Sequence, residues 1–402
     1  MSQYFNILFI YFLKKLIYNI FIMKKLIIFF TILLSVQAFA IDENTNNLKV
    51  LRVLKDNSPL RSLSNNDANR LTHLYKDTIL YSDSEKAGFY RIKLGDDNFV
   101  WINKKLAENI EFNKENIAEI SKIDFKETKE KYLIKLYAKT LFPYVFKEND
   151  NSLNLELYNY NYSKNEPILN NNIQFLKEGN KINFIYNSSK PLFGYDISPK
   201  KYGYLIEIKK SPILNKKKDL KNIKITLDAG HGGAESGVCA NNLKEKDINL
   251  QITKKLKKDF KKAGAKVYLT RKWDKTVEIY SRVDFAKKKN SDILLSIHQN
   301  SLPNWKDVIK KHGVGTYYYH NQSKALAQAL KDDLVKATNF KDDNINLRSF
   351  VLTRPTSELS VLVECGYLIK EEEAEKLKDS EFQKIISKTI VESVKNYLYN
   401  TY

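Results

Sequence analysis

Two histidines and two glutamates in the second half of the chain have the types and spacing that metal-dependent hydrolysis needs. Ile223, Ile225 and Leu227 alternate with polar residues, as in a strand. The run Asp-Ala-Gly-His-Gly-Gly follows and places His231 at the end of that strand. The others lie in the runs Leu-Lys-Glu-Lys-Asp (Glu245), Leu-Leu-Ser-Ile-His-Gln-Asn (His298) and Val-Leu-Val-Glu-Cys-Gly-Tyr (Glu364). Two neutral imidazoles and one carboxylate form the usual three-ligand catalytic zinc site, which leaves a fourth position for water. A lone histidine is more often structural, so the hypothesis depends on all four residues together.

These residues need a framework that brings them together, and the pattern of the C-terminal half predicts an α/β fold. Strand-like and helix-like stretches alternate along it. We expect strands at 223–229, 265–270, 292–298, 314–319 and 359–364, and helices at 245–262, 276–289, 323–338 and 380–398. The sheet is expected to be mixed or mostly parallel and to lie between helices. His231, His298 and Glu364 then stand at the trailing ends of three strands. Glu245 opens the helix after the first of them, so parallel strands would bring all four side chains to one edge.

The four stretches, in this order, resemble the zinc-dependent N-acetylmuramoyl-L-alanine amidases of bacterial cell-wall turnover over about residues 222–400. The resemblance implies that His231, Glu245 and His298 hold the zinc ion. It also implies that Glu364 is the base that takes a proton from water and returns it to the departing amine. The implied substrate is the amide between the lactyl group of N-acetylmuramic acid and the L-alanine of the stem peptide. Peptidoglycan is therefore the expected partner.

Further polar residues near these stretches are weaker candidates for the site. Asp228 and Asn300 lie close in sequence to the two histidines, and they either orient the imidazoles or only stabilise turns. Arg271 and Arg282 match arginines that are common in the family. Each either binds a substrate carboxylate or forms a structural ion pair.

Two other functions stay open from the sequence. The first is a wall-binding protein with an inactive catalytic domain, although such proteins usually lose a ligand or the base and this chain keeps all four. The second is a zinc peptidase that cuts within the stem peptide. The products separate the alternatives, because only the amidase frees the lactyl carboxylate of muramic acid.

The chain of 402 residues is basic, with 67 lysines and arginines against 47 aspartates and glutamates and a formal net charge of +20. Many of the lysines lie in helical stretches such as 254–258, where a solvated helix face is the simplest explanation. A basic exported protein is also attracted to anionic polymers of a cell envelope, which we expect as a further partner. No nucleic-acid-binding motif accompanies the charge, so no nucleic-acid partner is expected.

The N-terminus predicts export. From Met23 the chain has two lysines, an apolar run at 26–36 and Ala-Phe-Ala at 38–40, which are the parts of a secretory signal. Residues 1–40 are therefore expected to be a leader and signal peptide, with Met23 as the true start, and the mature protein to work in the periplasm or in the cell wall and extracellular space. Residues 1–22 are also rich in apolar residues, so a membrane anchor is the alternative, although neither this stretch nor the run at 26–36 reaches about 20 uninterrupted apolar residues.

The chain has only two cysteines, Cys239 and Cys365, which allow one disulfide. No spacing argument joins them. We expect Cys365 to be a buried strand residue, and the sequence assigns no role to Cys239.

Two small β-rich domains are expected before the catalytic domain at 215–402. Residues 41–110 resemble a bacterial SH3-like module, which either binds cell-wall peptides or forms an inert small barrel. Residues 111–214 are predicted to begin with a helix at 114–120, to continue as an antiparallel sandwich and to end in a linker at 211–220. The expected strands are 48–54, 69–75, 78–81, 88–94, 99–102, 132–137, 153–158, 181–186 and 204–208.

Overall fold

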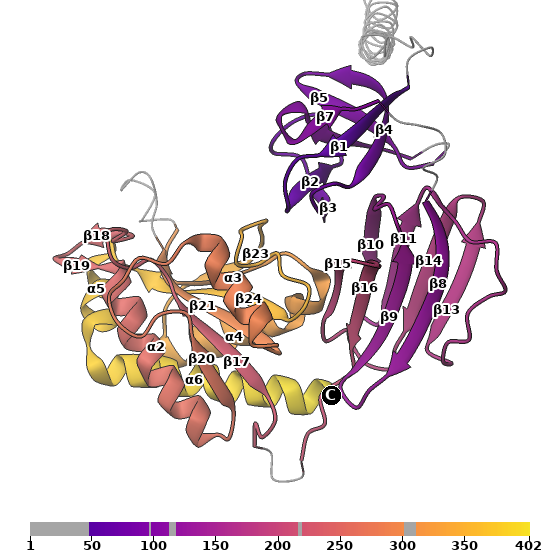
Figure 1. Cartoon of the computed structure of the whole chain (residues 1–402). Coiled ribbons are helices and arrows are strands. Elements are labelled where there is room, and N and C mark those ends of the chain that lie inside the picture. The colour runs from indigo at the N-terminus through magenta and orange to yellow at the C-terminus, as the bar shows by residue number, and fades with distance from the viewer. Residues whose placement is uncertain (1–47, 96–97, 112–117, 216–218, 301–310) are drawn as a thin grey trace, which may run out of the picture.

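The computed structural model of the chain describes residues 48–95, 98–111, 118–215, 219–300 and 311–402. The leader and signal peptide predicted at 1–40 lie outside these residues. The described chain folds, in order, into an N-terminal module of one sheet, a sandwich of two sheets and a C-terminal α/β domain (Figure 1). No helix within the described ranges is long and apolar enough to cross a membrane.

The N-terminal module is an antiparallel sheet with the strand order β3-β2-β6-β5-β4-β1-β7. Its elements are β1 (Lys49–Val53), β2 (Ser58–Arg61), β3 (Arg70–Leu74), β4 (Ile79–Lys86), β5 (Phe89–Lys93), β6 (Phe99–Asn103), the 3-10 helix η1 (Lys104–Leu106) and β7 (Ala107–Asn109). Leu51 and Val53 are buried and Arg52 between them is exposed, because successive side chains of a strand point to opposite faces. The sequence pattern anticipates five of these strands and misses β2 and β7.

The sandwich consists of the sheets β10-β11-β14-β13 and β12-β8-β9-β16-β15, which enclose a shared apolar core. Its strands are β8 (Ala118–Glu127), β9 (Lys131–Ala138), β10 (Tyr144–Glu148), β11 (Ser152–Tyr158), β12 (Tyr160–Asn161), β13 (Ile173–Glu178), β14 (Lys181–Asn187), β15 (Tyr195–Lys200) and β16 (Gly203–Lys209). The helix predicted at 114–120 is wrong where it can be compared, since residues 118–120 belong to β8. Ala118 and Ile120 are buried while Glu119 is exposed, which is the period of a strand.

The C-terminal domain has a six-stranded mixed sheet with the order β20-β17-β21-β24-β22-β23. Its strands are β17 (Lys224–Ala229), β20 (Lys266–Leu269), β21 (Ile293–Asn300), β22 (Val314–Tyr318), β23 (Asp342–Leu347) and β24 (Leu359–Tyr367), and β18 (Cys239–Ala240) pairs with β19 (Leu243–Lys244) in a separate hairpin. The helices are α2 (Glu245–Lys262), α3 (Ile279–Lys288), η4 (Asn321–Ser323), α4 (Lys324–Thr338), α5 (Glu371–Lys378) and α6 (Ser380–Thr401). Only β22 runs antiparallel to its neighbour β24, so the predicted mixed sheet is confirmed.

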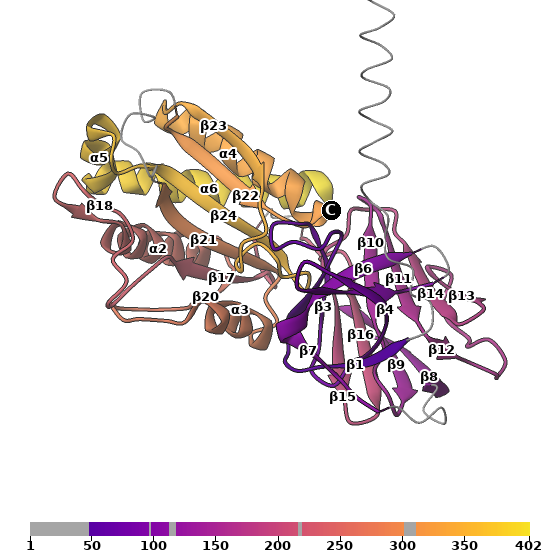
Figure 2. The ribbon, with the colours of Figure 1, turned by 90° about the horizontal axis from the view of Figure 1, so that it is seen from above.

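The two faces of this sheet are covered by different helices (Figure 2). Ile293, Leu295 and Ile297 of β21 share a core with α2, α4 and α6. Leu294, between them, packs on the other face against Ala286 of α3. Parallel β17, β21 and β24 therefore end at one edge of a sheet that is held from both sides, where side chains can be placed accurately.

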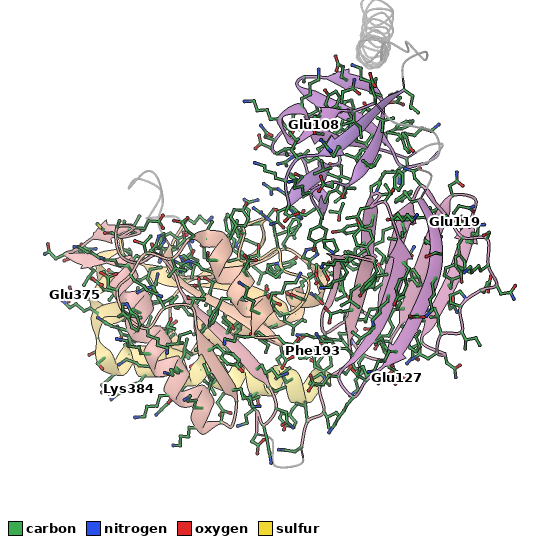
Figure 3. The ribbon with its side chains drawn as sticks, in the orientation of Figure 1. Glu108, Glu119, Glu127, Phe193, Glu375 and Lys384 are labelled. Atoms are coloured by element: carbon green, nitrogen blue, oxygen red, sulfur yellow. The ribbon has the colours of Figure 1, made fainter. Side chains whose placement is uncertain are left out.

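The three parts of the chain pack directly against one another. Phe193 of the sandwich joins the core of the C-terminal domain (Figure 3). The amide of Tyr195 donates to the carbonyl of Thr356 at 2.8 Å. The hydroxyl of Tyr319 donates to the carbonyl of Arg70 at 2.7 Å and accepts from its amide at 3.2 Å, which ties the N-terminal module to the C-terminal domain.

Candidate metal and catalytic site

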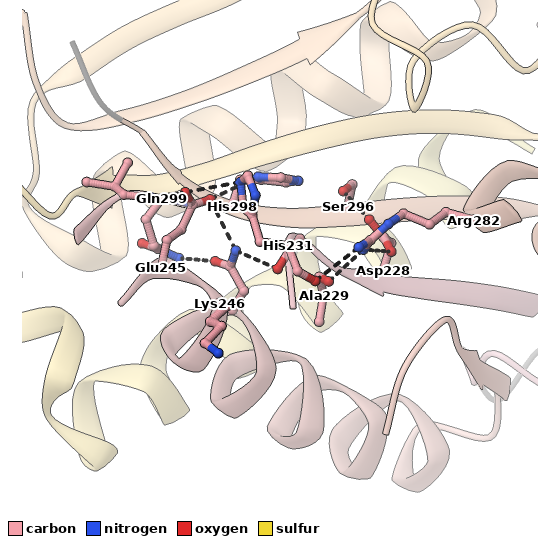
Figure 4. Close-up of polar contacts among 12 residues, drawn as sticks. Asp228, Ala229, His231, Glu245, Lys246, Arg282, Ser296, His298 and Gln299 are labelled. Atoms are coloured by element: carbon pink, nitrogen blue, oxygen red, sulfur yellow. Dashed lines mark hydrogen bonds and ion pairs between the residues drawn. The ribbon is translucent and has the colours of Figure 1, made fainter. Parts of the chain in front are cut away.

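Three side chains meet at the edge where the parallel strands end (Figure 4). His231 follows β17, Glu245 opens α2 and His298 lies near the end of β21. Each offers a ligand atom, and these atoms all lie within 4.8 Å of one another. His298 Nδ1 is 3.0 Å from Glu245 Oε1, and His231 Nε2 is 3.2 Å from Glu245 Oε2. The structure thus brings together the three residues that the sequence predicts as metal ligands.

Glycines leave the room that these side chains occupy. A Cβ on Gly230 would lie 2.3 Å from Cε1 of His298, and a Cβ on Gly237 would lie 2.3 Å from Oε2 of Glu245. His231 itself has a left-handed backbone with φ 59°, which turns the chain sharply after β17. The loop is therefore shaped so that both imidazoles face the same carboxylate.

Glu245 is held as an anion. Its side chain is 3% exposed, and the amide of Val238 donates to Oε2 at 3.0 Å. The amide of Gln299 and the side-chain amide of Asn249 donate to Oε1 at 3.2 and 3.1 Å. Burial opposes the charge, but the hydrogen bonds with His231 and His298 outweigh it and hold the pKa of Glu245 well below its usual range.

The donor set fits a zinc ion. Two ligand atoms bound to one tetrahedral zinc ion lie about 3.3 Å apart, close to the two nitrogen-to-oxygen distances found here. The ring nitrogen of His298 that faces Glu245 is Nδ1, and the hydrogen-bond donors around Glu245 keep this carboxylate ionised, as a metal ligand must be. Two imidazoles with a carboxylate match catalytic zinc better than magnesium or calcium, which prefer oxygen ligands.

Glu364 stands beside this cluster on β24, paired in register with His298 of β21. Its Oε2 atom is buried and unpaired among the described residues, although part of the side chain remains accessible. Burial, followed by the negative charges of Glu245 and Asp343, raises the pKa of Glu364 well above its usual value. The position of Glu364 suits a group that accepts and releases a proton.

Asp228 and Arg282 form a buried ion pair that supports the His231 loop. Arg282 Nη1 lies 2.9 Å from Asp228 Oδ1 and also donates to the carbonyl of Ala229, and Nη2 donates to the carbonyl of His231 at 3.0 Å. Thr270 and Ser296 donate to the two oxygens of Asp228 at 2.5 and 2.7 Å. Of the two roles considered for Arg282, the contacts favour the structural one, because its donors are occupied by the protein.

Arg271 also donates hydrogen bonds to backbone carbonyls of the His231 loop. Its Nε donates to the carbonyl of Ala229 at 2.9 Å, and its Nη2 donates to the carbonyls of Gly230 and Lys246 at 3.0 and 2.7 Å. The side chain is fully buried. Two arginines thus fix the peptide planes that carry His231.

Asn300 lies on the side of the site formed by β22 and β23. Its Nδ2 is 3.4 Å from the hydroxyl of Tyr317 and 3.5 Å from Oδ2 of Asp343, and the hydroxyl of Tyr367 donates to the same oxygen at 2.7 Å. These contacts link Asn300 to the wall of the site. An orienting role toward the imidazoles stays a prediction.

Asn249 and Gln299 are site residues that the sequence reasoning missed. Asn249 donates to Glu245 and to the carbonyl of Gly230, and Gln299 donates to Asn249 Oδ1 at 3.3 Å. Asn249 lies four residues after Glu245 on α2, a spacing that places both on one helix face and could have revealed it.

The two cysteines are both free. Cys365 is fully buried in β24, as predicted, and Cys239 is exposed in β18.

Comparisons with known proteins show which family the C-terminal part of the chain resembles. Residues 225–396 match the family model of N-acetylmuramoyl-L-alanine amidase. The uncharacterized protein YqiI of Bacillus subtilis is 31% identical over 177 residues, which are 43% of this chain and 84% of that protein. The probable cell wall amidase LytH of Staphylococcus saprophyticus is 31% identical over 183 residues, which are 45% of this chain but only 60% of LytH.

Two solved structures are similar over less than half of the chain. The N-acetylmuramoyl-L-alanine amidase AmiC2 of Nostoc punctiforme is 31% identical with a TM-score of 0.42, and the match covers 44% of this chain and 97% of that one. The catalytic domain of the amidase CwlV from Bacillus (Paenibacillus) polymyxa has the same identity and TM-score, with coverage of 44% and 98%.

Proposed function

Because this chain belongs to the N-acetylmuramoyl-L-alanine amidase family through residues 225–396, we propose that it hydrolyses peptidoglycan with a zinc ion held by His231, Glu245 and His298. The bond cleaved is the amide between N-acetylmuramic acid and the L-alanine of the stem peptide. The observation that carries the proposal is the meeting of two imidazoles and a buried, ionised carboxylate at the end of three parallel strands.

A zinc ion bound there would supply Lewis-acid chemistry, lowering the pKa of a water molecule and polarising the amide carbonyl. The protein's own contribution is to hold the ligands in place before the metal arrives. Glu245 is kept ionised by the donors Val238 N, Asn249 Nδ2 and Gln299 N and by the two imidazoles, and His231 is fixed through the carbonyls that Arg282 and Arg271 bind.

Glu364 is the proposed proton carrier. It lies next to His298 across the β21–β24 pair, and its unpaired Oε2 has no partner to give up before it takes a proton. It would accept a proton from the attacking water and return it to the nitrogen of the leaving L-alanine, which must leave as an amine.

The remainder of the chain would bring the enzyme to its substrate. We assign residues 1–40 to export, with the start at Met23, and so place the protein outside the cytoplasm. The SH3-like module at 41–110 and the sandwich at 111–214 would serve targeting, and the excess of lysines and arginines over acids favours anionic polymers of the envelope.

Product analysis tests the proposal. Purified sacculi are incubated with the full chain and zinc, and the products are identified by mass spectrometry. We expect stem peptides that begin with L-alanine together with glycan that bears free lactyl carboxylates, and we expect a zinc chelator to stop their release.

The same digest separates the alternatives. Fragments cut inside the stem peptide would indicate a zinc peptidase instead. Bound zinc without any released peptide would indicate an inactive wall-binding protein. The exposed Glu375, paired with Lys378 on α5, provides a matched control, since Glu375→Gln should leave the products unchanged.

A further inference from the structure

A cavity of about 450 Å³ lies where the three parts of the chain meet. The module contributes Arg70 and His73, the sandwich contributes Tyr144 and Phe146, and the C-terminal domain contributes Arg354 among others. This volume is in the range of sites for small ligands. The cavity is outside the cluster of His231, Glu245 and His298, so nothing described so far explains it.

The cavity lining includes the arginines Arg70 and Arg354. Arg354 donates to the carbonyl of Ser349 at 3.0 and 3.2 Å, and Arg61, just behind, donates to the carbonyl of Ala68 at 3.0 Å. The guanidinium of Arg70 has no hydrogen bond to any residue that the structure describes. None of the three forms an ion pair with a described carboxylate. Burial, and then repulsion between the arginines, lower the pKa of Arg61 and Arg354.

His73 is a further polar side chain of the lining without a partner for one of its ring nitrogens. Its Nε2 is buried and has no hydrogen-bond partner among the described residues. Burial first, and then the charges of Arg354 and Arg70, lower the pKa of His73 to about 3, so the ring is neutral at pH 7. A neutral imidazole between arginines can donate one hydrogen bond to an anion without adding to the repulsion.

Four acidic residues also line the cavity. Glu148 Oε1 accepts from the amide of Asn321 at 2.6 Å and lies 3.2 Å from His320 Nδ1. Asp196 is paired with Lys287 at 2.7 Å, and Glu358 accepts from the hydroxyl of Ser357. Asp284 is exposed. None of these four carboxylates forms an ion pair with Arg70 or Arg354 in the described part of the chain.

The remaining lining favours a peptide over a bare phosphate. It contains the aromatic and aliphatic side chains Tyr75, Tyr144, Phe146, Tyr280, Leu347 and Val351. Such surface would bury the body of a peptide while the arginines bind its carboxylate, as pockets with a few polar anchors do. An inorganic anion would make no contact with this apolar surface.

The cavity is also linked to the proposed site. The segment that supplies Val351 and Arg354 carries Phe350, whose ring lies 5.3 Å from that of Tyr317. Tyr317 is on β22, which pairs with β24 so that Gly315 lies opposite Glu364. Phe350 and β22 thus connect the segment that supplies Arg354 to the strand that carries Glu364.

We propose that this cavity binds a carboxylate-bearing peptide of the wall polymer, with Arg70, Arg354 and His73 holding the carboxylate. The proposal deepens the function above and rests on it only for the identity of the polymer. It makes the N-terminal module part of the substrate-binding surface.

Calorimetric titration of the full chain tests this. The probes are soluble stem peptide without muramic acid, the same peptide with its carboxylates amidated, and inorganic phosphate. We expect the free peptide to bind, and we expect Arg354→Gln and Arg70→Gln each to weaken that binding about tenfold or more, because each removes a charge-assisted hydrogen bond. Amidation should weaken binding to a similar extent.

Lys76→Gln is the matched control, since it removes one exposed charge from the same module outside the cavity. It should bind like the wild type, and all variants should give matching thermal unfolding curves. On sacculi, the arginine variants should raise KM and leave kcat unchanged. Equal binding by the arginine and lysine variants, or binding of phosphate in preference to the peptide, would overturn the proposal. A chain that binds the peptide but releases none from sacculi would contradict the amidase function and leave the cavity assignment standing.

Discussion

Gly230 shows how a single residue sets the geometry of the site. It has no side chain, and a Cβ at this position would lie 2.3 to 2.7 Å from three atoms of the His298 ring. The ring can reach Glu245 only because this space is empty. Local sequence explains the glycine as a turn residue, whereas the structure assigns it a steric role toward a residue 68 positions away.

Gly230→Ala should displace the His298 ring. We expect a loss of stability of about 1–3 kcal/mol from overpacking and a decrease in zinc affinity of about tenfold or more. Urea unfolding and competition with a zinc-binding dye measure the two effects. Gly95→Ala is the control, because a Cβ there meets nothing within 4 Å. If the two variants bind zinc equally well, His298 is not a ligand of the kind described.

At the scale of elements, the sequence predicts well whatever carries its own period. The bounds predicted for α2 coincide with those observed, because Ile248, Ile252, Leu256 and Phe260 repeat at four-residue intervals along one buried face. Acidic residues begin the helix and lysines end it, as the helix dipole favours. The three strands that carry the site are also close to prediction, since β17 alternates apolar residues and β21 and β24 are nearly continuous apolar runs.

Elements that form only through pairing with distant segments cannot be predicted from their own sequence pattern. β23 reads Asp-Asp-Asn-Ile-Asn-Leu, and only its pairing with β22 makes it a strand. The sequence predicts a helix at 114–120, but Ala118 and Glu119 pair with β12 and Ile120 pairs with β9, so these residues form a strand. The contacts of Arg282 with the His231 loop span 51 residues, so sequence spacing could not distinguish its two roles.

Glu358, just before β24, makes an element-scale prediction about pH. Burial raises its pKa to about 7, and the nearby Lys209 only partly offsets this. The unfolded chain releases that proton near pH 4.5, so the folded state holds one more proton between about pH 4.5 and 7. Stability should therefore fall as the pH rises through this window, by about 3 kcal/mol at most.

Glu358→Gln should remove this part of the pH dependence. Urea unfolding at several pH values from 4.5 to 8 would measure it, with the exposed Glu371→Gln as the control that keeps the wild-type slope. An unchanged slope in Glu358→Gln would mean that the carboxyl group is ionised in the folded protein.

At the scale of the whole molecule, the accessory parts are not loosely tethered. Phe193 of the sandwich lies in the core of the C-terminal domain, and Tyr402 at the chain end donates to the carbonyl of Leu192 at 3.0 Å. Removing everything before residue 215 would expose this apolar surface. The sandwich therefore contributes to the stability of the catalytic domain as well as to any targeting.

Tyr319→Phe tests the docking of the N-terminal module. The lost hydroxyl makes two hydrogen bonds with the backbone of Arg70, so we expect the Arg70 amide to exchange its hydrogen faster and the docked state to lose about 1–3 kcal/mol. Hydrogen exchange with mass spectrometry measures the exchange rate at Arg70 and, from it, the free energy of opening of the docked module. Tyr318→Phe, next in the chain, should have no such effect. Unchanged exchange at β3 in Tyr319→Phe would show that other contacts hold the module.

The most direct test of the central claim is zinc content and turnover of Glu364→Gln, measured beside His298→Ala. We expect Glu364→Gln to keep about one zinc ion per chain and to lose about 10²–10⁴-fold in the rate of stem-peptide release, because the ligands are intact and the proton carrier is gone. His298→Ala should lose both zinc and activity. A Glu364→Gln variant with a near wild-type rate, or one that loses its zinc, would contradict the division of roles between Glu364 and the three ligands.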